Sequence, residues 1–300
     1  MSASPKFGPA GWAYPHWNGI VYPKAHGTGF HALEFLARHV DVVEINTSFY
    51  QPLKPEIVKL WIKKVEGNPR FQFTAKLHQR FTHARVLEDA EVVEFKTGLA
   101  PLLHSDRLGA VLMQFPWSFR FTAENREFFI RLRRAFHEYP LAAEMRHSSW
   151  MAEEAIGTFL DYRVGFCNID QPAYTRAMPP TAFLTSGIGY VRLHGRNPQN
   201  SLGAYERNAI RARQHDYLYS EAELAEWAAR IGQISRFAES VFVIANNDAG
   251  GKSIVNTLQL QAMITGAHPR APRELRRQYP MELEKFAPEA NRQQCLFPAA

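Results

Sequence analysis

The stretch DVVEINTSFY, residues 41–50, decides how the rest of the chain is interpreted. Side chains of a β-strand alternate between two faces, so Val42, Glu44 and Asn46 share one face. The residues on both sides of this strand read as helices that would cover one of its faces. A strand in an ordinary two-layer domain would leave Glu44 and Asn46 in water. The polar face is therefore predicted to look into a closed interior, and the same pattern recurs along the chain.

The composition is that of a globular chain of 300 residues, 46% hydrophobic and 21% charged. Its length allows one or two domains, but single α/β barrels of about 250 residues or more are common. The net charge of +6 suits an anionic partner, either a small molecule such as a phosphate ester or a nucleic acid. Many soluble proteins are mildly basic, so charge alone does not decide this.

Cysteine usage and hydropathy indicate where the protein works. Cys167 and Cys295 cannot make a disulfide framework, and residues 1–12 lack the apolar core of a signal peptide. No apolar run approaches the ~20 residues that span a bilayer. We therefore expect a cytoplasmic protein with no membrane partner, and the oligomeric state stays open.

Eight strand-like segments alternate with helical ones. The expected strands are Phe7–Ala10, Asp41–Tyr50, Phe71–Lys76, Leu108–Phe115, Leu141–Arg146, Arg163–Asp170, Ile188–His194 and Val241–Asn247. The expected helices include Phe30–His39, Pro55–Val65, Glu88–Leu103, Glu124–Tyr139, Glu221–Phe237 and Lys252–Ile264. Strict alternation implies a parallel sheet, and eight repeats fit a closed (β/α)8 TIM barrel. No G-x-G-x-x-G follows the first strand, which argues against a dinucleotide-binding fold.

The spacing of the elements also predicts the domain organisation. We expect one barrel domain over residues 1–265, with long loops after strands six and seven, at residues 171–187 and Gly195–Ser220. Residues 266–300 are rich in proline and charge, and we expect an extension that packs on the barrel or is partly disordered.

The strand ends predict a site, because the chemistry of such barrels lies at the C-terminal ends of the strands. The late, inward-facing positions are Glu44, Asn46, Lys76, Gln114, Glu144, Arg146, Asn168, Asp170, Arg192, His194, Asn246 and Asn247. Burying unpaired charge is costly, so these groups must pair with one another or meet a ligand. A structural salt-bridge plug explains the pairing. It does not explain why polar residues occupy only the last part of each strand, so we predict a binding or catalytic site.

The basic members of this set suit an anion. Arg146, Arg192 and Arg196 offer planar forks that match phosphate or carboxylate oxygens. The sequence NDAGGKS, residues 247–253, opens a helix with glycine-rich backbone amides. Barrels often bind phosphate after strands seven and eight, although a simple glycine turn explains the segment equally well.

The acidic members allow general acid–base chemistry, with Glu44, Glu144 or Asp170 as the base and His194 as its partner. The same four side chains would suit a single divalent metal ion. We predict no cofactor, because multi-zinc phosphoesterase barrels need several inward-facing histidines. His78 and His83 follow strand three, where we expect a solvated or capping role. Covalent serine or cysteine chemistry is not expected, since the chain has no G-x-S-x-G elbow.

Several stretches resemble one family. They are GWAYPHW at 11–17, Tyr22-Pro23, VEINTSFY at 43–50, Phe71–Lys76, Thr82-His83, QFP at 114–116, EMRHSSW at 144–150, VRLHGR at 191–196, DYLYS at 216–220 and Asn246-Asn247. Together they resemble the YecE-like family, known as domain of unknown function 72, in order over roughly residues 7–265. The resemblance implies a TIM barrel with a shared site at its C-terminal face. A distant likeness of that family to endonuclease IV-type barrels makes nucleic acid or a phosphodiester the leading substrate.

Two places depart from the family pattern. His215 stands where a tyrosine often precedes the aspartate, and residues 248–251 replace a more basic segment after the asparagine pair. The second departure weakens the case for an anion site after strand eight.

Three functional hypotheses follow. The first is an enzyme, a hydrolase for example, acting on a phosphate-bearing substrate with nucleic acid among the candidates. Lys76, Arg146, Arg192 and Arg196 would hold its anion. Its ring or sugar would stack on Trp12, Trp17 and Tyr50, and its polar groups would bind Asn46, Asn246 and Asn247. The second is a carbohydrate hydrolase or isomerase using Glu44 and Glu144, and a guanidinium between those carboxyls would make hydrolysis implausible. The third is a non-catalytic protein that binds nucleic acid or a metabolite.

Overall fold

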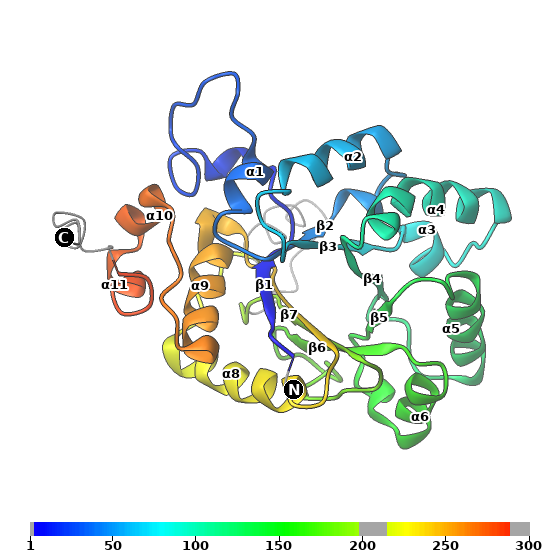
Figure 1. The fold of residues 1–300 in the computed structure, drawn as a ribbon. Coiled ribbons are helices and arrows are strands. Elements are labelled where there is room, and N and C mark those ends of the chain that lie inside the picture. Colours follow the sequence, from blue (N-terminus) through cyan, green and yellow to red (C-terminus); the bar gives the residue numbers. More distant parts are fainter. Residues whose placement is uncertain (1–2, 198–214, 289–300) are drawn as a thin grey trace, which may run out of the picture.

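The chain folds into a ring of parallel strands surrounded by helices (Figure 1). The structure, a computed structural model, describes residues 3–197 and 215–288, so the predictions for 198–214 and 289–300 lie outside it. Within these ranges the eight strands follow the order β1-β8-β7-β6-β5-β4-β3-β2, and each pair is parallel. The predicted TIM barrel is confirmed.

The strands contain four to seven residues, and the α-helices four to sixteen. The strands are β1 Lys6–Pro9, β2 Val42–Ile45, β3 Gln72–Lys76, β4 Leu108–Gln114, β5 Leu141–Glu144, β6 Gly165–Asp170, β7 Ile188–Leu193 and β8 Ser240–Ala245. The α-helices are α1 Ala32–Leu36, α2 Pro55–Lys64, α3 Gln79–Thr82, α4 Asp89–His104, α5 Ala123–Ala135, α6 Glu153–Asp161, α8 Glu221–Ser235, α9 Lys252–Thr265, α10 Arg273–Gln278 and α11 Pro280–Leu283. Short 3₁₀ turns are η1 Pro15–Trp17, η2 Thr47–Phe49, η3 Ser148–Met151 and η5 Ala249–Gly251. None of the helices in the described ranges is long and apolar enough to cross a bilayer.

Local sequence signals set where several helices begin. Ser220 Oγ accepts the backbone N–H of Glu223, whose carboxylate accepts the N–H of Ser220 in return, so α8 starts with a capping box. Thr122 Oγ1 accepts the backbone N–H of Asn125 at the start of α5. Pro55 occupies the first turn of α2, where its missing N–H is not needed.

The first helix is shorter than predicted, because α1 covers only residues 32–36 of the expected 30–39. The side-chain amide of Asn68 donates to the carbonyl of Ala37 at 3.0 Å and to that of Val40 at 3.2 Å. These bonds satisfy carbonyls that a longer helix would have used internally. The chain therefore turns into β2 early.

Strands β1 and β2, which stand at the two ends of the sheet order, come close together and close the barrel. Ala10 and Glu44 form an isolated parallel bridge between the ends of β1 and β2, and the N–H of Gly11 donates to the carbonyl of Glu44 at 2.9 Å. A Cβ on Gly8 would lie 1.7 Å from the carbonyl oxygen of Val42. Only glycine permits this approach of the two backbones.

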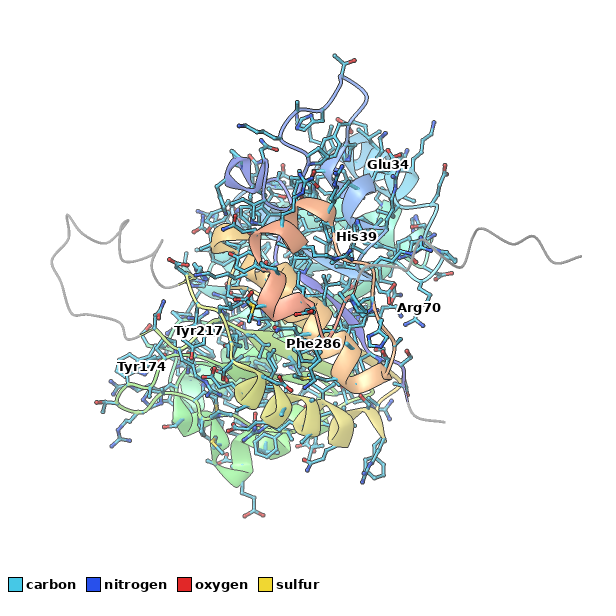
Figure 2. All side chains as sticks on the ribbon, turned by 90° about the vertical axis from the view of Figure 1, so that its left-hand side faces the viewer. Glu34, His39, Arg70, Tyr174, Tyr217 and Phe286 are labelled. Atoms are coloured by element: carbon cyan, nitrogen blue, oxygen red, sulfur yellow. The ribbon has the colours of Figure 1, made fainter. Side chains whose placement is uncertain are left out.

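The last described segment packs outside α9, where α10 and α11 lie against the barrel (Figure 1). Leu275 and Leu283 are fully buried there. The Tyr279 hydroxyl donates to the carbonyl of Gly250 at 2.8 Å, which ties α10 to η5. Phe286 lies on the same side of the molecule in Figure 2.

Candidate functional site

A cavity of about 630 Å³ opens at the C-terminal ends of the strands. The side view places Tyr174 and Tyr217 at this end of the molecule and Arg70 at the other (Figure 2). Seven predicted site residues line the cavity: Asn46, Tyr50, Lys76, Gln114, Arg146, His194 and Asn246. The strand ends therefore bring together about half of the predicted set.

Beneath the cavity floor lies a sealed ion network. Arg192 is 0% exposed and donates to Glu44 Oε1 at 2.8 Å and to Glu144 Oε2 through its other terminal nitrogen. Both carboxylates are also 0% exposed. Gln114 Oε1 accepts a third bond from Arg192 at 3.2 Å. A guanidinium thus stands between Glu44 and Glu144, and the cavity is lined by other residues.

This arrangement corrects the expected roles of the two glutamates. A pair of carboxyls that flanks a scissile glycosidic bond needs free oxygens and space for the substrate between them. Here one guanidinium holds both groups under the floor. Burial alone would raise the pKa of Glu144, but Arg192 and Arg146 hold that pKa well below its usual value. Glu144 is therefore a fixed anion, and glycoside hydrolysis by this pair is implausible.

Two cations rise from the network into the cavity. Arg146 Nε donates to Glu144 Oε1 at 2.7 Å, and its side chain is 22% exposed. Lys76 Nζ lies 3.7 Å from Glu44 Oε1, which is beyond hydrogen-bond distance, and its side chain is 13% exposed. Lys76, Arg146 and Arg192 thus face only the carboxylates of Glu44 and Glu144 in this cluster. The cluster carries a net positive charge when Lys76 is protonated.

His194 is a neutral part of the floor. Asn246 Nδ2 donates to its Nδ1 at 2.9 Å, so the ring proton belongs on Nε2, which lies 3.4 Å from Glu144 Oε1. Burial lowers the pKa of His194 to about 3, with Glu144 opposing this shift and Arg146 adding to it. His194 is therefore not a general acid near neutral pH, because the imidazolium form that would give up a proton is not populated.

A second titratable pair lies in the cavity wall. His215 Nδ1 lies 2.7 Å from the carbonyl of Asn246, so it carries the proton and leaves Nε2 free to accept one. Burial lowers the pKa of His215, and the charge of Asp248 opposes that shift. Burial also raises the pKa of Asp248, against the opposing effect of His215. Both side chains line the cavity, and they are the groups there best placed to exchange protons.

The cavity continues into an aromatic hollow. A neighbouring pocket of about 520 Å³ shares His83, Gln114 and Arg146 with the main cavity and adds Trp117 and Tyr174. Trp117 is 36% exposed, so its ring is accessible from this side. A substrate larger than one phosphate group could extend from the cations onto these rings.

Asp170 and Arg196 do not reach the cavity, contrary to the prediction. Arg196 forms a bidentate pair with Asp170, at 3.0 and 2.7 Å, and also donates to Glu223 at 3.0 Å. Asp170 accepts a further bond from the indole N–H of Trp227 in α8 at 2.5 Å. These partners lie between the sheet and the outer helix, so Asp170 points outward from β6.

Three further residues that were predicted to face the cavity also lie between the strands and the outer helices. Asn168 faces outward too and fixes residues 181–183 through Thr181 at 2.8 Å and Phe183 at 2.7 Å. Asn247 donates to Asn256 of α9 at 2.8 Å. Trp12 packs edge-on against Trp61 of α2, with ring centroids 5.0 Å apart. Their polar or aromatic groups build the layer between strands and helices.

The sequence reasoning missed several residues of the lining, among them Tyr14, His83, His215 and Asp248. His83 was expected to be solvated or capping, and it is exposed at the C-terminal end of α3 while it also lines the cavity. The signal for His215 and Asp248 was their departure from the family pattern. They lie far apart in the sequence, so only the fold brings them together.

Gly11 sets the position of Tyr14 in the wall. Its φ is +89°, and a Cβ there would lie 2.8 Å from the Tyr14 hydroxyl and 3.3 Å from Asn46 Nδ2. The Tyr14 hydroxyl donates to the carbonyl of Ala10 at 2.5 Å. Asn46 Oδ1 is buried and has no hydrogen-bond partner within the described ranges. The side chain of Asn46 lines the cavity, but this oxygen lies below the cavity surface.

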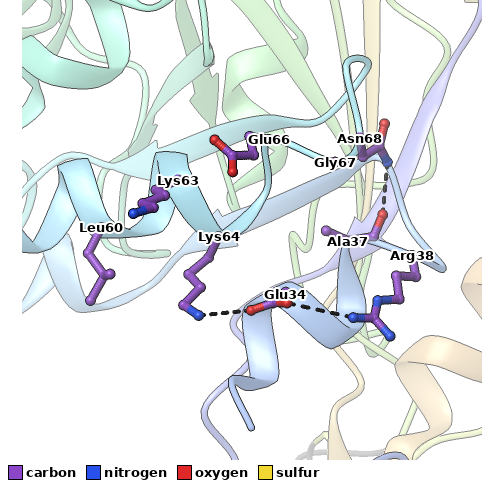
Figure 3. Close-up of a pocket in the computed structure, with 9 residues that line it drawn as sticks. All are labelled: Glu34, Ala37, Arg38, Leu60, Lys63, Lys64, Glu66, Gly67 and Asn68. Carbon is purple, nitrogen blue, oxygen red and sulfur yellow. Dashed lines mark hydrogen bonds and ion pairs between the residues drawn. The ribbon is translucent and has the colours of Figure 1, made fainter. Parts of the chain in front are cut away.

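Another hollow lies outside the barrel between α1 and α2 (Figure 3). Three of its charged groups are already paired, because Glu34 binds Lys64 at 2.8 Å and lies 3.6 Å from Arg38. Exposed pairs of this kind contribute little to affinity or stability. This hollow also lies away from the C-terminal ends of the strands. We therefore place the candidate site in the cavity of about 630 Å³ at those ends, which we call the barrel mouth. Across residues 3–197 and 215–288, no cluster of three or more His, Cys, Asp or Glu side chains is arranged to hold a metal ion.

Comparison with known proteins identifies the family. The profile described as "Protein of unknown function DUF72" matches residues 6–280. The chain belongs to the DUF72 family. The predicted YecE-like resemblance is thereby confirmed, and the match includes every residue of the cavity.

DUF72 proteins of similar sequence come from well-separated bacteria. The UPF0759 protein YunF of Bacillus subtilis is 28% identical over 256 residues, covering 81% of this chain and 90% of YunF. The UPF0759 protein YecE of Escherichia coli K12 is 35% identical over 107 residues, covering 35% of this chain and 37% of YecE.

Two solved DUF72 structures share the fold. The protein from Thermotoga maritima has a TM-score of 0.73 and 28% identity, covering 86% of this chain and 98% of the other. The protein from Enterococcus faecalis has a TM-score of 0.76 and 25% identity, covering 87% and 96%. The barrel is thus a property of the DUF72 family.

Proposed function

We propose that this DUF72 protein is an enzyme that binds a phosphate-bearing substrate in the barrel mouth, with nucleic acid among the candidate substrates. The observation that carries the proposal is the unbalanced charge of the floor. Lys76 and Arg146 enter the cavity above a network whose carboxylates are already held by Arg192. A bound phosphate would neutralise this excess and accept charge-assisted hydrogen bonds.

The neighbouring polar atoms support a phosphate ester in particular. The side chain of Asn46 lines the cavity, where its amide would bond a polar group of the substrate. Tyr50, which is 57% exposed, and Trp117 offer ring faces for a base or sugar, in place of the predicted Trp12 and the fully buried Trp17.

Proton transfer in this proposal belongs to His215 and Asp248. His215 Nε2 would take a proton from a water that attacks the phosphorus, while its Nδ1–H stays bound to the carbonyl of Asn246. The P–O ester bond would break, and Asp248, whose pKa is raised by burial, would give a proton to the leaving oxygen. Glu44 and Glu144 hold the cations in place beneath. His194, kept neutral by burial, accepts a hydrogen bond from Asn246 and so positions that side chain.

Titration calorimetry with inorganic phosphate and a short 5′-phosphorylated oligonucleotide tests the proposal. Arg146→Met should weaken phosphate binding by about tenfold or more, because a charge-assisted bond contributes about 1.5–3 kcal/mol. The control Arg38→Met removes the same charge outside the mouth and should leave binding unchanged. Oligonucleotide affinity should fall steeply as salt rises. Absence of phosphate binding by the wild-type protein would refute the proposal.

Product analysis separates the enzyme from a binding protein. Release of phosphate or shortening of the oligonucleotide should require His215 and be lost in His215→Ala. Tight binding with no turnover for any phosphate ester would favour the non-catalytic hypothesis. A carbohydrate hydrolase is not retained as a candidate, because Arg192 occupies the space between Glu44 and Glu144.

A further inference from the structure

Lys76 has a largely buried side chain, yet its amine is held more weakly than those of several paired lysines. Lys64, Lys96 and Lys252 each form an ion pair at 2.8 Å or less. Lys76 Nζ is 3.7 Å from Glu44, whose Oε1 already accepts Arg192 at 2.8 Å and whose Oε2 lies 3.0 Å from the Tyr190 hydroxyl. The carboxylate nearest to this amine is therefore committed to stronger partners.

The backbone of Lys76 is held firmly while its amine faces the cavity. Lys76 is the last residue of β3, and the Ser48 hydroxyl donates to its carbonyl at 2.7 Å. The side chain lines the cavity, with Nζ 5.7 Å from the centre of the Phe49 ring. The aliphatic part of the Lys76 side chain is buried, and its Nζ points toward the cavity.

We propose that Lys76 is an amine nucleophile that forms an imine with the aldehyde or ketone carbon of an anionic substrate. The proposal rests on the proposed function, since Arg146 would hold the phosphate or carboxylate of that substrate. It narrows the substrate class to compounds that carry both an anionic group and a carbonyl.

The charge of the floor favours the unprotonated amine that this chemistry requires. Burial and the charge of Arg192 lower the pKa of Lys76 to about 8, with Glu44 and Glu144 opposing the shift. At pH 7 the neutral fraction is then roughly 300-fold larger than for a lysine of ordinary pKa. Lys76 can lose its proton at little cost because Arg146 and Arg192 still balance the two carboxylates.

The step needs only a proton from solvent besides the two reactants. The nitrogen lone pair of Lys76 forms a C–N bond to the carbonyl carbon, and a proton passes from that nitrogen to the carbonyl oxygen to give a carbinolamine. The C–O bond then breaks as the oxygen takes a second proton, from solvent, and leaves as water, and a protonated imine remains. The imine nitrogen carries a positive charge next to Glu44, where the ammonium stood before. A carboxylate beneath this nitrogen stabilises the product.

Pyridoxal 5′-phosphate is a suitable probe, because it joins an aldehyde to a phosphate. The full chain is incubated with it at neutral pH, reduced with borohydride and mapped by peptide mass spectrometry. The adduct should form on Lys76 at least about tenfold faster than on Lys6 or Lys252. Lys6 is an informative control, because burial also lowers its pKa but it begins β1 at the opposite end of the barrel. Equal labelling of these lysines would overturn the proposal.

Two matched probes and two variants complete the test. Pyridoxine 5′-phosphate has an alcohol in place of the aldehyde and should bind without an adduct, and pyridoxal lacks the phosphate and should label Lys76 more slowly. Lys76→Arg should lose the adduct although its cationic charge remains, and Lys76→Met, which lacks both amine and charge, should lose it as well. No adduct on Lys76 overturns the imine whether or not pyridoxine 5′-phosphate binds. If neither that compound nor inorganic phosphate binds, the proposed function fails as well.

Discussion

Two arginine–carboxylate clusters lie near the ends of neighbouring strands and have opposite consequences. Arg192 of β7 points into the barrel and joins Glu44 to Glu144, while Arg196, four residues later, joins Asp170 to Glu223 outside it. The inner cluster supports a cavity whose floor carries excess positive charge. The outer cluster pins α8 to the sheet. Charged residues at strand ends therefore indicate a site only when their side chains face the axis.

Removing the central arginine of each cluster should give the largest difference. Arg192→Met leaves two fully buried carboxylates without their partner and should lower the free energy of unfolding by about 3–5 kcal/mol. Arg196→Met should cost less, about 1–3 kcal/mol, because Arg196 is 29% exposed and water can replace part of its bonding. Denaturant unfolding monitored by circular dichroism measures both values.

The triple variant Glu44→Gln, Arg192→Met, Glu144→Gln sharpens that result. If buried unpaired charge is the cause, neutralising both glutamates should recover part of the loss. A triple variant as unstable as Arg192→Met alone would show that packing, and not charge, decides the inner cluster.

Asp170→Asn and Arg146→Met should behave as opposites. Asp170→Asn should cost about 1–3 kcal/mol in unfolding free energy, because its bidentate bond to Arg196 is weakened, and should leave phosphate affinity unchanged. Arg146→Met should lower phosphate affinity more than stability. Calorimetry and denaturant unfolding on the same samples check both. A loss of phosphate binding in Asp170→Asn would contradict the division into an inner and an outer cluster.

His194 predicts a pH dependence that is specific to the inner cluster. Its pKa falls from 6.5 in the unfolded chain to about 3 in the folded one, so only the unfolded chain binds this proton as pH drops below 6.5. Stability should then decrease by about 1.4 kcal/mol per pH unit from this group, with no contribution above pH 6.5. His194→Gln should have a shallower slope between pH 6.5 and 4.5. Parallel slopes in the two proteins would contradict a buried neutral His194.

The smallest effect is expected at the rim of the outer cluster. Glu226 Oε2 lies 3.9 Å from Arg196 and its side chain is 57% exposed. Glu226→Gln should change the unfolding free energy by less than about 0.5 kcal/mol, because solvent screens the pair. This variant sets the baseline against which the other substitutions are compared.

Alternation along the strands predicted the barrel and half of its site correctly. Glu44, Lys76, Arg146, Arg192 and His194 all face inward, because β2, β3, β5 and β7 have apolar outer positions that leave polar residues on the inner face. The family resemblance independently led to the same fold. The predictions from strand alternation depend only on local periodicity and on the order of elements.

Strand β6 shows what periodicity cannot supply. Cys167 and Ile169 face the interior here, and Asn168 and Asp170 face outward. The hydrogen-bonding groups that satisfy the outward pair come from Thr181, Phe183 and Trp227, far along the chain. A pattern of alternating residues fixes which side chains share a face, but distant partners decide which face is inside.

The hydrogen bond from Tyr279 to the carbonyl of Gly250 affects where the chain can be truncated. The DUF72 match stops at residue 280, yet Leu283 and Ala287 are still fully buried. A fragment trimmed to the family boundary would contain every cavity residue and lose the apolar anchors that keep α10 seated. The cavity wall at Asp248 would then lose part of the packing that supports it. We therefore expect a stable fragment to extend beyond residue 280.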